Sequence, residues 1–390
     1  MKIGIATLYY QNFNYGGQIQ ALAMQKILEG EGHEAKLIAY RQDTVKYFRQ
    51  RLADLGPADS AARIFRKIIF RFLRMRPAVG RAFLLREKRF LTFMKKIPHT
   101  DTVYTERNIG LCDRYFDCYV CGSDQIWNPS WWNDFLLLNF TRKPRFAYGA
   151  SIARISLTES QKRCLSESTR EFAGVSVREN QAKVLLEEFL CRKVEWVLDP
   201  VFLVPAAKWR RLAVKPAIGQ PYILIYNLGN STGLLREICR RARREGFYIV
   251  SVGFGHNTYF RSRGADVDEE ILDAGPREWM GLIAGASCVF TDSFHGTAFS
   301  LLFQKNFWCF EKDRERKNHE NSRLYSILKI CGAEERLLRP GALLDKALFR
   351  APLDYAAVEE RMEERRRTSM AYIRKCLREV EHEQGKKSPD

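Results

Sequence analysis

The stretch VFTDSFHGTAFSLLF, residues 289–303, indicates an α/β fold, because an apolar strand pattern passes directly into a helix pattern. Its polar residues lie at the junction of the two patterns. In a parallel sheet such a junction brings the first-turn amides and the positive end of the helix dipole to the carboxyl edge of the strands. We therefore expect Ser293, His295 and Thr297 to surround an anion at this helix start.

His295 is the candidate catalytic residue of this junction. The chain has six histidines, and the other five lie in hydrophilic or turn-like segments. An imidazole that titrates near neutral pH can transfer protons, so we expect a catalytic or anion-binding role, with a helix cap as the alternative. A Ser-His-Asp hydrolase fits poorly, because the G-x-S-x-G elbow is absent. With no visible cluster of metal ligands, we expect no metal and no cofactor.

Alternating strand and helix patterns extend from this junction over most of the 390 residues and predict two α/β domains. The first is expected over residues 1–205 and the second over residues 221–350, with a linker containing Pro and Gly between them. Residues 351–390 are expected to form a charged C-terminal helix or tail. The short apolar runs are typical of parallel strands that helices cover on both faces.

The loop YQNFNYGGQ, residues 10–18, follows the first predicted strand and leads into a helix. Asn14, Gly16 and Gly17 therefore stand where a parallel sheet presents ligands. A dinucleotide site fits poorly, because the G-x-G-x-x-G fingerprint is absent and the second predicted strand does not end in an acidic residue. A simple Asn- and Gly-containing turn is the alternative interpretation.

The loop CGSDQIWNPSWWND, residues 121–134, is rich in side chains that suit a sugar. Its hydrogen-bonding groups are Ser123, Asp124, Gln125 and Asn128. We expect Trp127 to offer a flat apolar face, while Trp131 and Trp132 anchor the loop in the core. Asp124 is either a general base or a residue that caps the loop.

Positive charge dominates the composition, with 64 Lys and Arg against 46 Asp and Glu and a formal charge of +18. This balance points to anionic partners. Much of the excess lies in a basic helical insertion at 61–96, which we expect to pack one face on the core. Docking on an anionic membrane or on nucleic acid are the alternatives. Without a membrane-spanning run or a signal-peptide pattern, the protein is expected to be cytoplasmic.

Ten cysteines occur, and Cys118 and Cys121 form a C-x-x-C inside a strand pattern. Residues three apart on a strand point to opposite faces, so these two cannot share a metal ion. We expect buried, reduced thiols rather than a zinc site.

Six segments, in this order and at these intervals, resemble the polysaccharide pyruvyl transferase family. They are NYGGQIQALAMQ (14–25), CGSDQIWNP (121–129), YGASIA (148–153), SVRE (176–179), DPVFLV (199–204) and TDSFHGTAFSLLF (291–303). The resemblance runs from Ile3 to about Arg323. It implies two Rossmann-like domains that face each other across a cleft, as in GT-B glycosyltransferases, with the acceptor on the first domain and the donor on the second.

The resemblance also implies a reaction, in which the pyruvyl group of phosphoenolpyruvate moves onto two hydroxyls of a sugar and forms a cyclic ketal. Such ketals belong to exopolysaccharide, capsule or cell-wall glycan biosynthesis. The expected partners are phosphoenolpyruvate and a glycan or lipid-linked oligosaccharide acceptor, with no nucleic acid. Contact with an anionic membrane surface would make the protein peripheral on the inner face of the membrane.

Matched positions carry the implied site. The SFHGT segment resembles the donor-side site, Arg178 of SVRE resembles an arginine that meets the donor, and Arg323 is a weaker donor candidate. Asp124 is the expected base for a sugar hydroxyl. The expected acceptor-binding residues are Asn14, Gly16, Gly17, Ser123, Gln125, Trp127 and Asn128.

Two other functions compete with this one. The first is a GT-B glycosyltransferase that uses a nucleotide sugar, and it would differ in its donor. The second is a non-catalytic basic adaptor that associates with membranes, and it would depend entirely on the insertion at 61–96.

Overall fold

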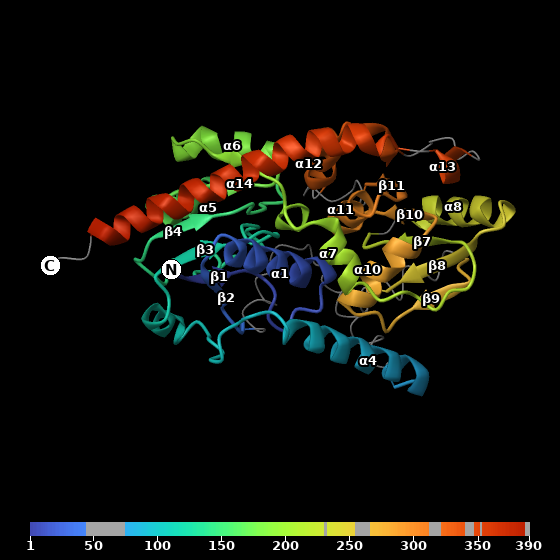
Figure 1. Ribbon diagram of the computed structural model, residues 1–390, viewed down its shortest axis with the longest axis horizontal. Coiled ribbons are helices and arrows are strands. Elements are labelled where there is room, and N and C mark those ends of the chain that lie inside the picture. The colour runs from blue at the N-terminus through green and yellow to red at the C-terminus, as the bar shows by residue number, and fades with distance from the viewer. Residues whose placement is uncertain are drawn as a thin grey trace.

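Two parallel β-sheets, placed side by side along the long axis of the molecule, organise the computed structural model (Figure 1). The structure describes residues 1–43, 75–229, 232–253, 266–311, 321–339, 347–351 and 353–386. All strand pairs of both sheets in these ranges are parallel, which confirms the predicted α/β class.

The first sheet has the strand order β2-β1-β3-β4. Its strands are β1 (Lys2–Ala6), β2 (Glu34–Leu37), β3 (Cys118–Cys121) and β4 (Arg145–Ala147). A bridge between Ala150 and Val177 leads to the short pair β5 (Ser176–Val177) and β6 (Glu195–Trp196). The helices of this half are α1 (Tyr15–Gly30), α4 (Pro77–Met94), η1 (Ile109–Arg114), α5 (Glu159–Thr169), α6 (Asn180–Leu190), η2 (Pro200–Phe202) and α7 (Ala206–Leu212).

The second sheet has the order β12-β11-β10-β7-β8-β9. Its strands are β7 (Tyr222–Tyr226), β8 (Tyr248–Val252), β9 (Glu269–Ile271), β10 (Cys288–Thr291), β11 (Asn306–Phe310) and β12 (Leu337–Leu338). The helices that follow are α8 (Thr232–Arg244), α10 (Pro276–Gly285), α11 (Phe294–Leu302), α12 (Ser322–Cys331), η4 (Glu334–Arg336), α13 (Ala347–Arg350) and α14 (Tyr355–Lys386).

The central strands are buried along their whole length. Every residue of β3, β7 and β10 is buried, as their apolar runs predict for strands that are covered on both faces. Cys118 and Cys121 belong to two different core clusters and so lie on opposite faces of β3, which confirms that prediction. Both are free cysteines.

The stretch between the two predicted domains contains a packed helix, which the sequence patterns did not indicate. Trp209 of α7 is buried, and the Val214 N–H donates to the Arg277 carbonyl at 3.0 Å. The strands of the two sheets fall within residues 1–205 and 221–350. These domain bounds themselves stay a prediction.

Tyr15 at the start of α1 attaches the first half to the second. Its hydroxyl donates to the carbonyls of Gly253 at 3.1 Å and Ala274 at 3.0 Å. Its ring stacks on Trp279 at 5.3 Å between centroids. These contacts are buried, so the start of α1 is fixed relative to both sheets.

Helix α14 crosses from the second half back over the first (Figure 1). The Leu198 N–H donates to Ser369 Oγ at 3.0 Å, and the Tyr372 hydroxyl donates to the Ala147 carbonyl at 2.7 Å. The charged C-terminal segment is therefore part of the packing of both halves.

The basic insertion predicted at 61–96 is described only from residue 75 onward, and its earlier residues lie outside the described part. Helix α4 buries Phe83, Phe90 and Phe93, together with Arg86, on its inner face. Core packing of one face is thus confirmed for α4. Over the described residues, no helix has both the length and the apolar composition needed to cross a membrane.

Candidate active site

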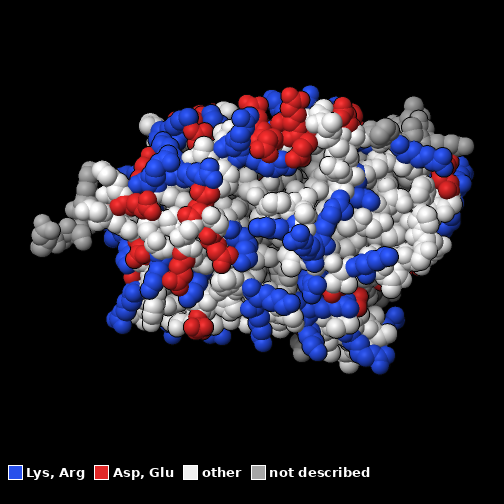
Figure 2. Space-filling view, viewed as in Figure 1, with Lys and Arg blue, Asp and Glu red and all other residues white. Residues whose placement is uncertain are grey.

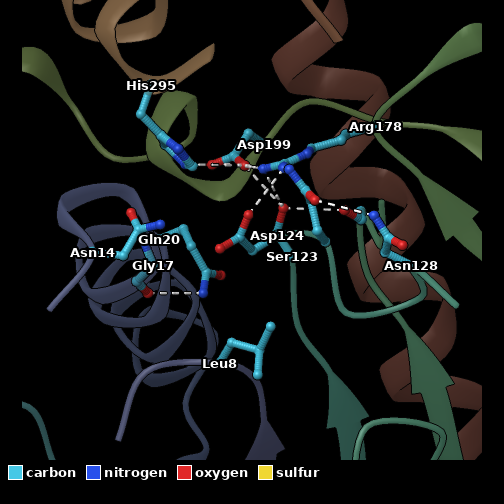
Figure 3. Close-up of polar contacts among 12 residues, drawn as sticks. Leu8, Asn14, Gly17, Gln20, Ser123, Asp124, Asn128, Arg178, Asp199 and His295 are labelled. Atoms are coloured by element: carbon cyan, nitrogen blue, oxygen red, sulfur yellow. Dashed lines mark hydrogen bonds and ion pairs between the residues drawn. The ribbon is translucent and has the colours of Figure 1, made fainter. Parts of the chain in front are cut away.

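Two helix starts meet where the halves of the chain come together (Figure 3). His295 lies in the first turn of α11, directly after β10, and Gly16 lies in the first turn of α1. A Cβ atom added to Gly16 would lie only 2.0 Å from Nδ1 of His295. Glycine is therefore required at this position for the imidazole to sit where it does. This contact gives Gly16, a predicted acceptor residue, a positioning role.

Arg178 is the centre of a buried cluster of ion pairs beside the α11 start (Figure 3). Nη1 lies 2.5 Å from Asp199 Oδ2, and Nη2 lies 3.2 Å from Asp124 Oδ1. Nε lies 3.5 Å from Glu179 Oε1, and the guanidinium covers the Phe294 ring at 4.6 Å. Each nitrogen of this predicted donor-binding arginine faces a carboxylate of the protein.

Asp199 connects this cluster to the imidazole, although it is not among the predicted site residues. Its Oδ2 accepts a hydrogen bond from Ser123 Oγ at 2.9 Å and lies 3.7 Å from Nε2 of His295. Its Oδ1 accepts from the Val201 N–H at 3.1 Å. The available signal was the segment VEWVLDP, which places an acidic residue directly after a predicted strand.

Burial lowers the pKa of His295 to about 4, because removal from water disfavours the charged imidazolium. Asp199 and Asp124 oppose this shift, whereas Arg178 and Arg323 add to it. The imidazole is therefore neutral at neutral pH, and the expectation that it titrates there is wrong for this arrangement. Its Nε2 makes no hydrogen bond to the described residues.

The two acids next to Arg178, Asp124 and Glu179, have pKa values that are shifted in opposite directions. Burial raises the pKa of Asp124, but Arg178 and other nearby positive charge outweigh it and hold that pKa below its usual value. Burial raises the pKa of Glu179, and Arg178 compensates only in part. Asp124 has a left-handed φ of 77°, which side chains rarely adopt, and its carbonyl accepts from the Ser151 N–H at 2.9 Å. It therefore both shapes the loop and carries a negative charge in the site.

Ser293 and Thr297 use their hydroxyls within α11. Ser293 caps the helix by accepting from the Gly296 N–H at 3.3 Å. Thr297 is fully buried, and its hydroxyl donates to the Ser293 carbonyl at 3.1 Å and contacts Cys309 Sγ. A donor-binding role does not fit Thr297, because its hydroxyl is turned into the helix. Ser293 is 4% exposed, and its hydroxyl is engaged in the cap.

Trp127 was predicted to offer a face to a sugar, and its placement corrects that prediction. Its side chain is 0% exposed and belongs to the core of the first half. Trp131 and Trp132, predicted as the core anchors, are partly exposed, and Trp132 packs against the same core. The loop has no regular periodicity, so the sequence did not distinguish the buried tryptophan from its neighbours.

Gln125 and Arg323 join the two halves next to the cluster. With the Gln125 amide oriented so that its oxygen meets donors, that oxygen accepts from both Nη atoms of Arg323 at 2.7 and 2.8 Å. Gln125 is half-buried, and Arg323 lies in the first turn of α12. This link brings the weaker donor candidate to the predicted acceptor loop.

Most of the other predicted acceptor residues have structural partners. Asn14 caps α1 by accepting from the Gly17 N–H at 3.2 Å, although its side chain is half-buried. Ser123 is fully buried, with its hydroxyl on the Asp199 carboxylate. Asn128 is buried, and its Oδ1 accepts from the Ser130 N–H at 3.1 Å. Among these, only Asn14 and Gln125 retain partly exposed side chains.

A groove of about 560 Å³ separates α6 from α12, and residues of both halves line it. Its polar lining residues include Asn180, Gln181, Ser322 and Ser326, and its apolar ones include Ile155 and Val184. Two of these lining residues, Asn180 and Ser322, are chain neighbours of Glu179 and Arg323.

The arrangement combines what anion binding and proton transfer require. Two guanidinium groups and the positive end of α11 suit an anion, and a neutral imidazole lies 3.7 Å from the carboxyl group of Asp199. Within the described ranges, no three His, Cys, Asp or Glu side chains come together in a way that could hold a metal ion.

Comparison with known proteins adds a family and a fold. The family model of polysaccharide pyruvyl transferase matches residues 14–314 of the chain. A UDP-GlcNAc 2-epimerase from Neisseria meningitidis, bound to UDP-GlcNAc, is 10% identical over 97% of this chain and 99% of its own, with a TM-score of 0.52. A putative UDP-N-acetylglucosamine 2-epimerase from Listeria monocytogenes is 11% identical over 100% and 98%, with a TM-score of 0.50. No curated protein matches the chain.

Identities this low show the fold alone, which is two Rossmann-like domains that face each other across a cleft in the GT-B-like manner. The family match covers more than half of the chain and confirms the resemblance that the six sequence segments indicated.

Proposed function

The chain belongs to the polysaccharide pyruvyl transferase family, and from this membership we propose that it transfers the pyruvyl group of phosphoenolpyruvate to two hydroxyls of a sugar. The product is a cyclic ketal on a precursor of an exopolysaccharide, capsule or cell-wall glycan. One observation carries the proposal: a neutral, buried His295 with an unbonded Nε2 lies at a helix start beside two arginines and two aspartates.

The donor is an anion that suits this position. Phosphoenolpyruvate carries a phosphate and a carboxylate, and guanidinium forks together with helix-start amides bind such groups well. In the proposal one donor anion takes the place of Asp124 on Arg178, because that contact is 3.2 Å long whereas the Asp199 contact is 2.5 Å. Arg323 holds the second anionic group.

Proton transfer is then assigned to His295 and Asp124. A sugar oxygen bonds to C2 of the donor, its proton passes to the imidazole, and a proton is added to the methylene carbon. The bond from C2 to the phosphate oxygen breaks, and the second sugar hydroxyl closes the ketal. Of the two hydroxyl protons, one balances the new methyl group and the other leaves with the phosphate.

Binding of the donor changes the pKa of His295 and so lets it act as an acid. Negative charge near an imidazole raises its pKa, so the pKa of His295 increases when the donor is bound. The imidazole that accepted the first hydroxyl proton can then deliver a proton to the methylene carbon. Asp124, released from Arg178, serves as the base for the second hydroxyl.

We place the acceptor in the groove between α6 and α12. The half-buried amide of Gln125 and the polar lining of this groove suit sugar hydroxyls, while Ile155 and Val184 suit the apolar face of a sugar ring. Trp127 is left out because it is buried in the core.

The test is incubation of the full chain with phosphoenolpyruvate and a panel of glycosides that carry neighbouring or 1,3-related hydroxyls. We expect phosphate release together with the added mass of a pyruvyl ketal. His295→Gln should reduce this turnover by about 10²-fold or more, the usual contribution of a general acid or base. His33→Gln, a half-buried histidine at the other end of α1, is the matched control.

A thermal-shift experiment separates donor classes. The proposal expects protection of the fold by phosphoenolpyruvate, whereas protection only by nucleotide sugars would favour a glycosyltransferase. The proposal fails if no glycoside of the panel supports phosphate release and His295→Gln behaves like the unaltered protein.

A further inference from the structure

The outer face of α4 has an unusual combination of side chains. Leu84 and Leu85 are 60% and 40% exposed. Arg81, Lys88 and Lys95 are also exposed, and their spacing of seven residues places them in one row along the helix. The two leucines lie between the first two cations of this row. We call these five residues the α4 outer face.

Exposed apolar side chains are concentrated at this end of the insertion. Met75, at 73%, is the most exposed large apolar side chain of the described residues, and it lies two residues before the start of α4. Single exposed apolar residues are normal on a protein surface. Three of them within eleven residues, next to cations, indicate a surface that contacts something partly apolar.

The charge of this region is strongly one-sided. Residues 75–96 contain seven Lys and Arg and a single acid, Glu87. Figure 2 shows Lys and Arg along the lower edge, where α4 lies, whereas Asp and Glu gather at the upper edge over the first turns of α14. An anionic partner would therefore be attracted to the α4 side of the molecule.

We propose that the α4 outer face docks on an anionic lipid bilayer. The cations would pair with lipid phosphates, and the two leucines would reach below the headgroups. A bilayer fits better than nucleic acid because the apolar contacts are aliphatic, whereas single-stranded nucleic acid is usually held by stacking on aromatic side chains.

Docking would be transmitted to the candidate active site through the inner face of α4. Arg86 Nη2 donates to the Phe13 carbonyl at 2.8 Å, in the loop that leads to Gly16. Phe90 packs on Tyr15 at 5.0 Å between ring centroids. A bilayer under α4 would thus contact the helix whose inner face holds the start of α1, where Gly16 lies against His295. The docking itself does not rest on the proposed function.

The test is sedimentation of the full chain with vesicles of phosphatidylcholine alone or mixed with phosphatidylglycerol. We expect binding to the mixed vesicles only, weakened by added salt. Arg81→Gln and Lys88→Gln should each lower the partition coefficient about fivefold. The double change Leu84→Ser, Leu85→Ser should lower it about tenfold or more, from the apolar area that no longer enters the bilayer.

Matched controls use exposed residues elsewhere. Arg236→Gln on α8 and Leu111→Ser on η1 remove the same side chains from other surfaces and should leave partition unchanged. Circular dichroism of each variant checks that the fold is intact. Binding that is absent with mixed vesicles, or equally weakened by the controls, overturns the proposal. Retention of single-stranded RNA in place of vesicles also overturns it.

Turnover separates docking from catalysis. The Leu84→Ser, Leu85→Ser variant should keep full turnover on a water-soluble glycoside while it loses vesicle binding. If the proposed reaction itself is wrong, vesicle binding and its loss in this variant are unaffected, so the two failures are distinguishable.

Discussion

Replacement of Gly16 by alanine tests whether the position of His295 is set by the start of α1. The added Cβ would lie 2.0 Å from Nδ1 of His295, and real contacts of this kind are not shorter than about 3.0 Å. The imidazole or the helix must therefore move by about 1 Å. A displacement of about 1 Å in a site commonly costs about 10²-fold in rate. Overpacking by one methyl group costs about 1–3 kcal/mol of the free energy of unfolding.

The assay for Gly16→Ala measures phosphate release from phosphoenolpyruvate with an accepted glycoside, together with urea unfolding. We expect both the rate and the stability to fall by these amounts. NMR titration should also show the pKa of His295 rising from about 4 toward its ordinary value, because a displaced ring is better solvated.

Two glycines provide matched controls. Gly30→Ala lies in the same helix with no atom within 4 Å of the new Cβ, so neither rate nor stability should fall. In Gly174→Ala the new Cβ would lie 2.4 Å from Cys376 Sγ of α14. This variant should lose stability but keep its turnover, because the crowding is against α14 and not against His295. The reasoning is refuted if Gly16→Ala keeps full turnover in an intact fold, or if Gly174→Ala loses as much turnover.

Three further predictions concern buried polar groups. The pKa of His295 is about 4 in the folded chain and about 6.5 in the unfolded one, so its stabilising effect is complete above pH 6.5 and is lost as the pH falls to 4. Compared with His295→Asn, the unaltered protein should lose up to about 3 kcal/mol more over this range in pH-dependent urea unfolding. Arg178→Met should lower the free energy of unfolding by about 3–5 kcal/mol, because it leaves buried carboxylates without a cation. The exposed Arg163→Met should change it by less than about 0.5 kcal/mol, and equal effects of the two changes in calorimetry would contradict this prediction. Tyr15→Phe removes a hydroxyl shared by two buried carbonyls, and denaturant titration should show a loss of about 1–3 kcal/mol rather than no change.

Local patterns were sufficient for the parts of the site that lie within one strand–helix junction. The segment at 289–303 forms a strand and a helix as predicted, and His295 stands in the first turn. Asn14 and Gly16 likewise begin α1 directly after the first loop. Capping residues and apolar spacing act over a few positions, so the sequence displays them directly.

Contacts between distant segments could not be predicted in the same way. The pairing of Arg178 with Asp199 and Asp124 depends on which strand ends come together, and that order is a property of the folded sheets. The low pKa of His295 requires its burial against Gly16 from the other end of the chain. Long-range packing, rather than residue type, decides both features.

The return of α14 over the first half also has a consequence for biosynthesis. About 170 residues separate Leu198 from its partner Ser369, and translation at about 5–20 residues per second takes roughly ten to thirty seconds to cover them. During that time the first half emerges from the ribosome without α14. The Ala147 carbonyl of β4 and the Leu198 N–H just before η2 then lack their hydrogen-bond partners. The nascent first half therefore lacks these contacts until Ser369 and Tyr372 have been made, and it is open to misfolding and proteolysis during that time.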